Sequence, residues 1–294
     1  MSKPLLTFGI PAYTRPELLA EALGSIAAQS AQADCEVVVC DDARKDRTRE
    51  LAKAFTRWPC RYLPNEPALG AVGNWNRCLR EARGTWVTVL HEDDALFPGY
   101  LKAVFPRLRD GLAAVCARTV QGPAYPAGGS APRGGSPRVW SYPPRHFIKS
   151  AMSPFPGVLV RTDLALRLGG FSEAWGPLAD YEFWYRLACA GPVEVVREEA
   201  AFYRVAPGQW TEQSWRRMLR LTHLLRLRIA REQFGGSPRL GRWLARFFTH
   251  RNALSYAARF GGRDAGLARA LSLGRIPLAW LPSGWVWQAL KRER

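Results

Sequence analysis

The sequence predicts an α/β fold with a mostly parallel, doubly wound sheet, helices on both faces of that sheet, and a helical extension at the carboxyl terminus. Two observations predict it. Short, nearly continuous apolar runs alternate with helical patterns up to residue 91 in the order βαβαβαβ, with turns of a few residues between them. From residue 211 on, the pattern is helical and rich in arginine. We therefore expect one domain over residues 1–210 and a basic helical region over residues 211–294.

The first strand is expected at residues 5–10, and Pro11 ends it. Thr14 and Glu17 have the spacing of a capping box around Pro16, so a helix should begin there. The same criteria predict strands at 35–40, 60–63, 86–90, 113–117 and 157–161, and helices at 47–55, 70–82, 98–108, from about Asp180, from 211 and at 240–260.

A stretch rich in proline, glycine and serine covers residues 122–144. Such a composition predicts a long, flexible surface loop. The loop could be a plain insertion or a flap over an active site, and the sequence favours neither.

The chain carries 42 basic and 25 acidic side chains, a formal net charge of +17. This excess favours polyanionic surroundings, namely nucleic acid, an anionic membrane surface or phosphorylated substrates. The six cysteines form no CxxC motif, as expected for a reducing compartment. Because no signal peptide or transmembrane stretch stands out, we expect a cytoplasmic protein.

Polar side chains follow three of the predicted strands. Pro11, Ala12 and Tyr13 come after the first strand, Asp41 and Asp42 after the second, and the acidic run 92–94 after the strand that ends near residue 90. Ligands of open α/β sheets collect at the carboxyl ends of strands, so these groups should converge. Crowded carboxylates repel one another, and a divalent cation such as Mg²⁺ or Mn²⁺ relieves the repulsion. An isolated acidic turn of this kind is also compatible with a solvated loop.

The order of these motifs resembles the family 2 glycosyltransferases of the GT-A fold, which use nucleotide sugars and typically work by inversion. The resemblance covers roughly residues 3–210. The motifs that carry it are Pro11 to Arg15, Glu36 to Asp42, Asn65, Gly70, Asn74 to Asn76, Gly84, Leu90 to Asp94 with Pro98, Gly169 to Phe171, Ala179 to Glu182 and Tyr203 to Val205.

The resemblance implies a role for each matching residue. Asp180 would be the catalytic base, although an aspartate at a helix start is more often a cap. Asp93 and Asp94 would hold the cation, Mn²⁺ or Mg²⁺. The residues implied to bind the nucleotide are Pro11, Ala12, Tyr13, Arg15, Asp42, Asn74, Asn76 and Asp93.

Two departures from the family pattern concern the cation. His91 stands where many relatives have another aspartate, and Ala206 stands where many have a histidine. A ligand-poor site of this kind is expected to bind its cation together with the nucleotide, with water and phosphate oxygens completing the shell.

The expected function is transfer of a sugar, UDP-linked by preference, to a hydroxyl of a glycan, lipid-linked or other acceptor in bacterial surface-glycan synthesis. The basic helices after residue 211, with Trp280, Trp285 and Trp287, could rest on the inner face of an anionic membrane, or the tryptophans could be core residues. Nucleic acid is not expected as a partner. The alternatives are a nucleic-acid-binding basic protein, a nucleotidyltransferase, and a GT-A fold that binds nucleotide without turnover.

Overall fold

The structure of the chain is a computed structural model, and it describes residues 3–30, 34–126, 139–206 and 208–260. The chain divides into two compact units. The first comprises Met1–Tyr142 and Met152–Ala206, and the second comprises Pro143–Ala151 and Pro207–Arg294. The tryptophans at positions 280, 285 and 287 lie outside the described residues, as does most of the predicted loop.

The amino-terminal half of the first unit follows the predicted alternation of strands and helices. Strand β1 pairs in parallel with β2 on one side and with β4 on the other, and β2 pairs in parallel with β3. The elements are β1 (Leu6–Ala12), α1 (Pro16–Ala27), β2 (Cys35–Asp41), α2 (Asp46–Ala54), β3 (Cys60–Pro64), α3 (Gly70–Glu81) and β4 (Trp86–Val89).

The second half of this unit adds strands of mixed direction. The sheet order is β3-β2-β1-β4-β8-β6-β9-β5, with β7 also paired to β9, so nine strands form one sheet within the described part of the chain. Strand β8 is antiparallel to both β4 and β6. The elements are β5 (Ala95–Leu96), α4 (Tyr100–Val104), β6 (Ala114–Gly122), β7 (Val139–Ser141), β8 (Val158–Arg161), α5 (Thr162–Arg167), α6 (Ala179–Ala190) and β9 (Val193–Arg204).

The fold-class prediction is confirmed, with corrections in its details. The predicted capping box is wrong, because Arg15 is the N-cap residue of α1 and no side chain among the described residues caps this helix. Strand β9, twelve residues long, was not predicted because the charged run 197–199 breaks its alternation, and its register with β6 shifts in the same region. The last part of the predicted loop forms β7 instead. The predicted helix 98–108 shrinks to α4 and a 3₁₀ turn over Phe105–Arg107, where Pro106 interrupts it.

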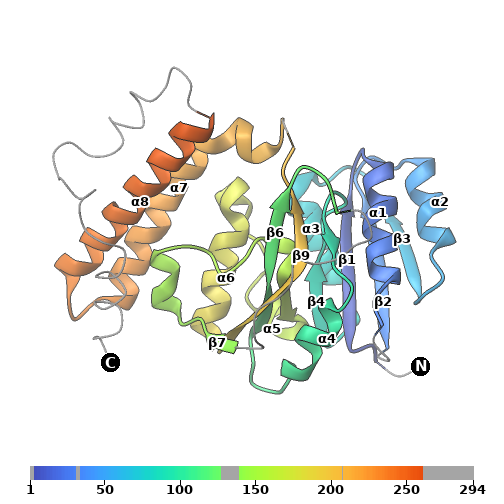
Figure 1. Cartoon of the computed structure of the whole chain (residues 1–294), viewed down its shortest axis with the longest axis horizontal. Coiled ribbons are helices and arrows are strands. Elements are labelled where there is room, and N and C mark those ends of the chain that lie inside the picture. The colour runs from blue at the N-terminus through green and yellow to red at the C-terminus, as the bar shows by residue number, and fades with distance from the viewer. Residues whose placement is uncertain (1–2, 31–33, 127–138, 207, 261–294) are drawn as a thin grey trace. The chain divides into compact units, whose positions relative to one another are not determined.

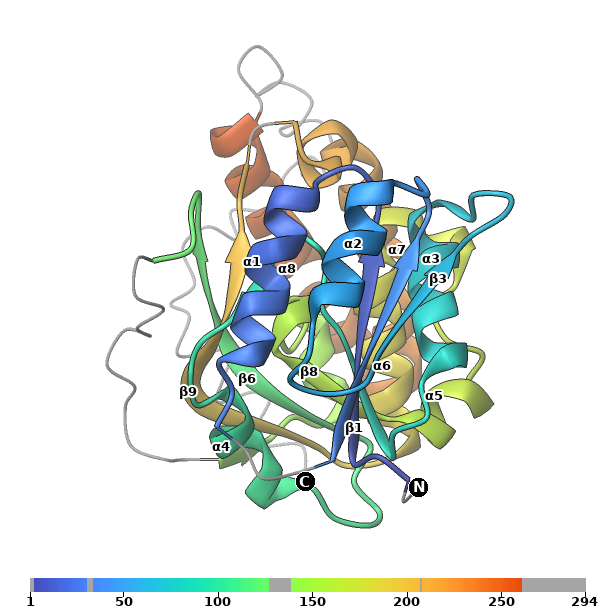
Figure 2. The ribbon, with the colours of Figure 1, turned by 90° about the vertical axis from the view of Figure 1, so that its right-hand side faces the viewer.

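Helices cover both faces of the sheet. Figure 2 shows α1 and α2 in front of the strands, with α3, α5 and α6 on the far side. The strands β1, β2 and β4 are buried along their whole length, as expected for a parallel sheet covered on both sides. Their carboxyl ends therefore bring the loops after them to one edge of the sheet.

The second unit is a helical hairpin with a short segment from the middle of the chain. It contains α7 (Trp210–Gln233), α8 (Pro238–Phe260) and the 3₁₀ helix Pro144–Ile148, and α7 and α8 run side by side (Figure 1). Arg226 of α7 is fully buried and donates hydrogen bonds to Thr249 of α8 and to the carbonyl of Lys149. Among the described residues, the protein has no helix long and apolar enough to cross a membrane.

Candidate active site

A buried glutamate joins the loops that follow β1 and β4. The carboxylate of Glu92, which is 2% exposed, accepts hydrogen bonds from the backbone N–H of Tyr13 (2.8 Å) and of Thr14 (3.3 Å). These two loops are neighbours because β1 and β4 pair in the sheet. The carboxylate thus holds the Pro11-Ala12-Tyr13 turn against the acidic loop.

Arg15 completes this junction. Its Nε lies 3.2 Å from Oε1 of Glu92 and its Nη1 lies 2.7 Å from Oδ2 of Asp93. The guanidinium therefore neutralises two of the three crowded acids, while nearly half of its side chain remains exposed. The sequence implied a direct nucleotide contact for Arg15, and the structure places it among the acids at the same edge.

Asp93, Asp94 and His91 form a group that could hold a metal ion. One carboxylate oxygen of each aspartate and one ring nitrogen of His91 all lie within 4.8 Å of one another. Oδ2 of Asp94 and Nε2 of His91 are buried and have no hydrogen-bond partner among the described residues. Buried polar atoms without partners are costly, and a cation held by this group is one way to satisfy them. The donor set fits a divalent ion.

Burial shifts the pKa values of Asp94 and His91. Burial, followed by the neighbouring charge of Asp93, raises the pKa of Asp94 well above its usual value, against the opposing effect of Arg204. Burial also lowers the pKa of His91 to about 4, so its ring is neutral at physiological pH. A bound cation would favour the ionised form of Asp94 and offset its burial.

Arg204, at the end of β9, braces the acidic loop from the other side. Its backbone N–H donates to Oδ1 of Asp94 (3.0 Å), and its Nε donates to the carbonyl of Asp93 (2.9 Å). Its Nη2 forms an ion pair with Glu21 of α1. The side chain is 7% exposed, so this brace lies within the core of the unit. Arg204 was part of a motif in the sequence, but its partners were not predictable.

Asp42 lies at the amino end of α3. Its carboxylate accepts hydrogen bonds from the backbone N–H groups of Leu69 and Gly70 and from the side chain of Asn65. Three of its roughly four acceptor positions are therefore filled by the protein. One position is left for a ligand donor.

The two asparagines of α3 make contacts within the protein. Asn74 donates to the carbonyls of Ala12 and Cys40 and accepts from Asn65, so it ties together the ends of β1 and β2. Asn76 donates to the carbonyl of Phe171 and accepts from its N–H, both at 2.8 Å. Both asparagines thus connect chain segments, and the implied nucleotide contact stays a prediction at both positions.

Asp180 is the second residue of α6, at the end where free N–H groups favour a carboxylate. Burial outweighs this effect and raises the pKa of Asp180 to about 6. Trp184, one turn further along α6, contacts Phe155 with ring centroids 5.7 Å apart, and Phe155 contacts His91 at 4.4 Å. Two ring contacts therefore connect the helix that carries Asp180 with the acidic loop.

Among the remaining sequence-predicted residues, Pro11 and Ala12 are buried at the end of β1, whereas the side chain of Tyr13 is 58% exposed. The three residues that sequence reasoning left without a role are Glu92, Asn65 and Arg204. All three were visible as parts of motifs. Their function as anchors depends on partners between 9 and 183 positions away in the chain.

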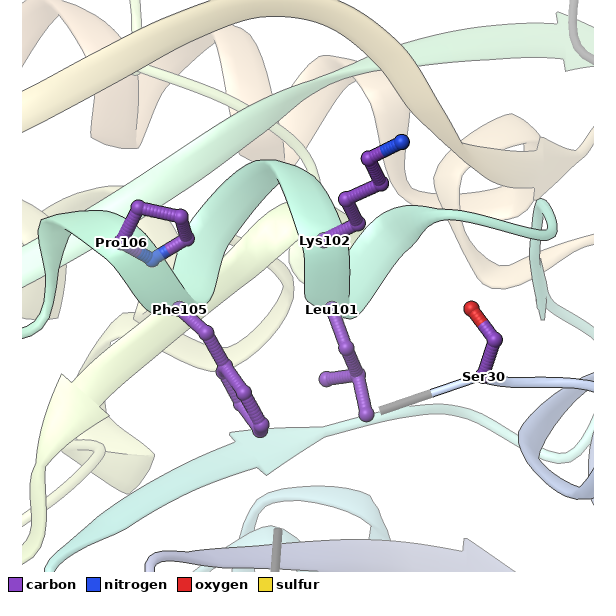
Figure 3. A pocket seen from close by; sticks show the side chains of 5 residues that line it. All are labelled: Ser30, Leu101, Lys102, Phe105 and Pro106. Carbon is purple, nitrogen blue, oxygen red and sulfur yellow. The ribbon is translucent and has the colours of Figure 1, made fainter. Parts of the chain in front are cut away.

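A hollow of about 300 Å³ lies elsewhere in the first unit, and none of the predicted site residues lines it. Leu101 and Phe105 point to one side and Lys102 points away from them (Figure 3). The residues that line the hollow are Ser30, Leu101, Lys102, Phe105 and Pro106. They include no acid.

The fold belongs to the GT-A class of glycosyltransferases. The protein is similar to the mannosyltransferase PcManGT of Pyrobaculum calidifontis, solved in complex with GDP-Man and Mn²⁺, with a TM-score of 0.58 and 22% identity over 99% of this chain and 81% of that one. Glycosyl transferase family 2 matches residues 7–152. The chain belongs to this family and is a glycosyltransferase.

Two relatives are similar in sequence. An uncharacterized protein of Mycobacterium tuberculosis, MT1568, is 31% identical over 217 residues, which are 69% of this chain and 68% of that protein. The UDP-Glc:alpha-D-GlcNAc-diphosphoundecaprenol beta-1,3-glucosyltransferase WfgD of Escherichia coli is 32% identical over 94 residues, which are 32% of this chain and 37% of that protein.

Replacement of Glu92 by alanine is expected to lower the free energy of unfolding by roughly 2–4 kcal/mol, because two backbone N–H groups and Arg15 lose their buried acceptor. Glu92→Gln keeps one oxygen acceptor and should cost less. Urea unfolding measures both. The matched control is Glu50→Ala, which removes an exposed ion pair on α2 and should stay within about 0.5 kcal/mol of the parent. Equal effects of the two alanine variants would contradict the anchoring role of Glu92.

Proposed function

We propose that this protein transfers a sugar from a nucleoside diphosphate sugar to an acceptor hydroxyl with inversion at the sugar carbon. The observation that carries the proposal is the group formed by His91, Asp93 and Asp94, whose ligand atoms converge at the carboxyl end of β4. Oδ2 of Asp94 is buried there without a partner among the described residues. A site with this donor set suits a divalent cation that also contacts a diphosphate.

On the donor side, Asp93 and Asp94 hold the cation, which is Mn²⁺ or Mg²⁺ and binds together with the nucleotide. When bound, the ion neutralises the charge that develops on the leaving diphosphate. The exposed ring of Tyr13 lies beside the base, and the remaining acceptor position of Asp42 takes a hydrogen bond from the base edge. Asn74 and Asn76 keep these groups in place through their clamps to β1, β2 and Phe171.

On the acceptor side, Asp180 removes the proton from the attacking hydroxyl. A pKa of about 6 suits this role, because the group is ionised at neutral pH and is a stronger base than an ordinary aspartate. Its position on α6 separates it in sequence from the acids of the donor side. One carboxylate can therefore serve the acceptor while the others serve the cation.

The donor is proposed to be a UDP-sugar and the acceptor a lipid-linked glycan intermediate in bacterial surface-glycan synthesis. The name of the Escherichia coli relative, which specifies UDP-Glc and a diphosphoundecaprenol-linked acceptor, supports both choices. The mannosyltransferase of Pyrobaculum calidifontis was solved with GDP-Man, so a GDP-sugar is the alternative donor.

A panel of UDP-, GDP- and dTDP-sugars tests the proposal through release of nucleoside diphosphate. We expect release from a UDP-sugar in the presence of Mn²⁺ or Mg²⁺ and none after chelation of the cation. The same nucleotide with its cation should raise the melting temperature, because a ligand that binds only the folded state stabilises it. Stabilisation by duplex DNA, and by no nucleotide with its cation, would contradict the proposal and favour a nucleic-acid-binding protein.

The proposed base predicts a pH profile. Because Asp180 must be ionised to accept a proton, kcat/KM should rise about tenfold per pH unit below about pH 6 and level off above it. Asp180→Asn should lower kcat by roughly 10²–10⁴-fold while leaving nucleotide binding unchanged.

Glu173→Gln, which neutralises an exposed carboxylate before α6, is the control and should keep the parent profile. Unchanged turnover in Asp180→Asn would exclude Asp180 as the base.

We also propose peripheral contact between α7 and an anionic membrane surface, on which a lipid-linked acceptor would lie. Helix α7 carries six arginines and two glutamates. Arg217, Arg220 and Arg231 are exposed, and the exposed Leu224 lies among them on the same helical face. Arginine side chains with an apolar neighbour are typical of helices that bind anionic headgroups.

The triple variant Arg217→Glu, Arg220→Glu, Arg231→Glu should lose binding to vesicles that contain phosphatidylglycerol, as measured by co-sedimentation. Each arginine near such a surface contributes about 1 kcal/mol, and reversal of three charges should remove most of the binding. Binding to phosphatidylcholine vesicles should be weak for both proteins.

The matched control reverses the same number of charges on α2, at Arg47, Arg49 and Lys53. If this control loses vesicle binding as fully as the α7 variant does, the contact depends on net charge and the assignment to α7 is wrong.

A further inference from the structure

The imidazole of His91 is held in place by two aromatic rings. Its centroid lies 5.3 Å from that of Trp75, with the ring planes 20° apart, and 4.4 Å from that of Phe155. Both neighbours are at least 93% buried, so they restrict how the imidazole can turn. The ring is therefore oriented by packing, although its Nε2 makes no hydrogen bond among the described residues.

A buried ring nitrogen without a partner is unusual, because its desolvation is not compensated. An imidazole that served only as packing would leave this nitrogen desolvated without compensation, whereas an apolar ring would not. Here a ring nitrogen of His91 lies within 4.8 Å of an oxygen of Asp93 and an oxygen of Asp94. Donor atoms that share one cation at about 2.0–2.2 Å lie no more than about 4.4 Å apart, so these side chains need to shift by only a few tenths of an ångström to hold it.

We propose that His91 is itself a ligand of the cation, so that the site has a mixed nitrogen and oxygen set and prefers Mn²⁺ or Co²⁺ to Mg²⁺. This inference rests on the proposed function, because it concerns the same site. Imidazole nitrogen suits transition metals, whereas Mg²⁺ strongly prefers oxygen.

The neutral imidazole adds a donor without adding charge. The two aspartates would then supply the negative charge, and His91 would supply the preference for Mn²⁺ or Co²⁺ over Mg²⁺. Asp93 also forms an ion pair with Arg15, which reduces the negative charge that Asp93 offers to a hard ion. The nitrogen of His91 therefore contributes a larger share of the binding energy of the cation. The sequence had suggested a ligand-poor site, and the packing of His91 points to the missing ligand.

The direct test is pulsed electron paramagnetic resonance of Mn²⁺ bound to the full chain with UDP. A directly bound imidazole couples its ¹⁴N nucleus to the Mn²⁺ electron spin and modulates the electron spin echo. We expect this modulation in the parent protein and its loss in His91→Phe, which keeps an aromatic ring against Trp75 and Phe155. Mn²⁺ affinity, measured by calorimetry with UDP present, should fall about tenfold or more in His91→Phe.

His91→Asp provides a second, independent measurement. This variant replaces the nitrogen ligand with an oxygen ligand, so the ratio of Mn²⁺ to Mg²⁺ affinity should fall about tenfold relative to the parent. The circular dichroism spectrum and melting temperature of each variant establish that it folds. A parent protein that binds Mn²⁺ without ¹⁴N modulation, and an unchanged affinity ratio in His91→Asp, would overturn the inference.

The outcomes separate this inference from the proposed function. If Asp94→Asn loses Mn²⁺ while His91→Phe retains it with full affinity, the acidic site stands and the histidine ligand is refuted. If the parent binds no Mn²⁺ with UDP, both the cation site and the histidine ligand are refuted. Release of nucleoside diphosphate in the donor panel is measured separately and tests the proposed sugar transfer.

Discussion

The buried carboxylate of Glu92 is the interaction on which the geometry of the site depends. It joins a loop after β1 to a loop after β4, although the hydrogen-bonded residues are 78 and 79 positions apart in the chain. Arg15 extends the same junction to Asp93. The carboxylate is almost fully buried. If the two loops separated, its charge would remain buried without partners, and this cost keeps the loops together.

Around this junction, some polar atoms of the acidic loop have hydrogen-bond partners and others have none. Arg15 and Arg204 satisfy most of the acidic loop through side-chain and backbone hydrogen bonds. One oxygen of Asp94 and one nitrogen of His91 remain buried without partners among the described residues. These two atoms lie in a buried environment, where electrostatic interactions are stronger than in water. Such a pair of atoms suits a cation that arrives with a diphosphate.

Much of this could be predicted from the sequence, and the reasons for success and failure are physical. The strands before residue 90 were predictable because they are continuous apolar runs bounded by turns, and the acids after them were predictable because strand ends meet at one edge. Strand β9 was not predictable, since its charged middle hides its alternation. The partners of Asn74, Asn76 and Arg204 were not predictable, because hydrogen bonds between distant segments leave no periodic signal.

The sequence by itself determined the α/β fold class, the family motifs and the identity of the acidic residues, because these depend on local pattern and on order along the chain. Only the tertiary structure decided how those acids are used. It paired Glu92 with backbone N–H groups, filled most of the acceptor positions of Asp42, and packed His91 against Trp75 and Phe155. Burial and partnership are properties of the folded chain. They turn three similar carboxylates into one anchor, one ion-pair partner and one group with a buried oxygen that has no partner among the described residues.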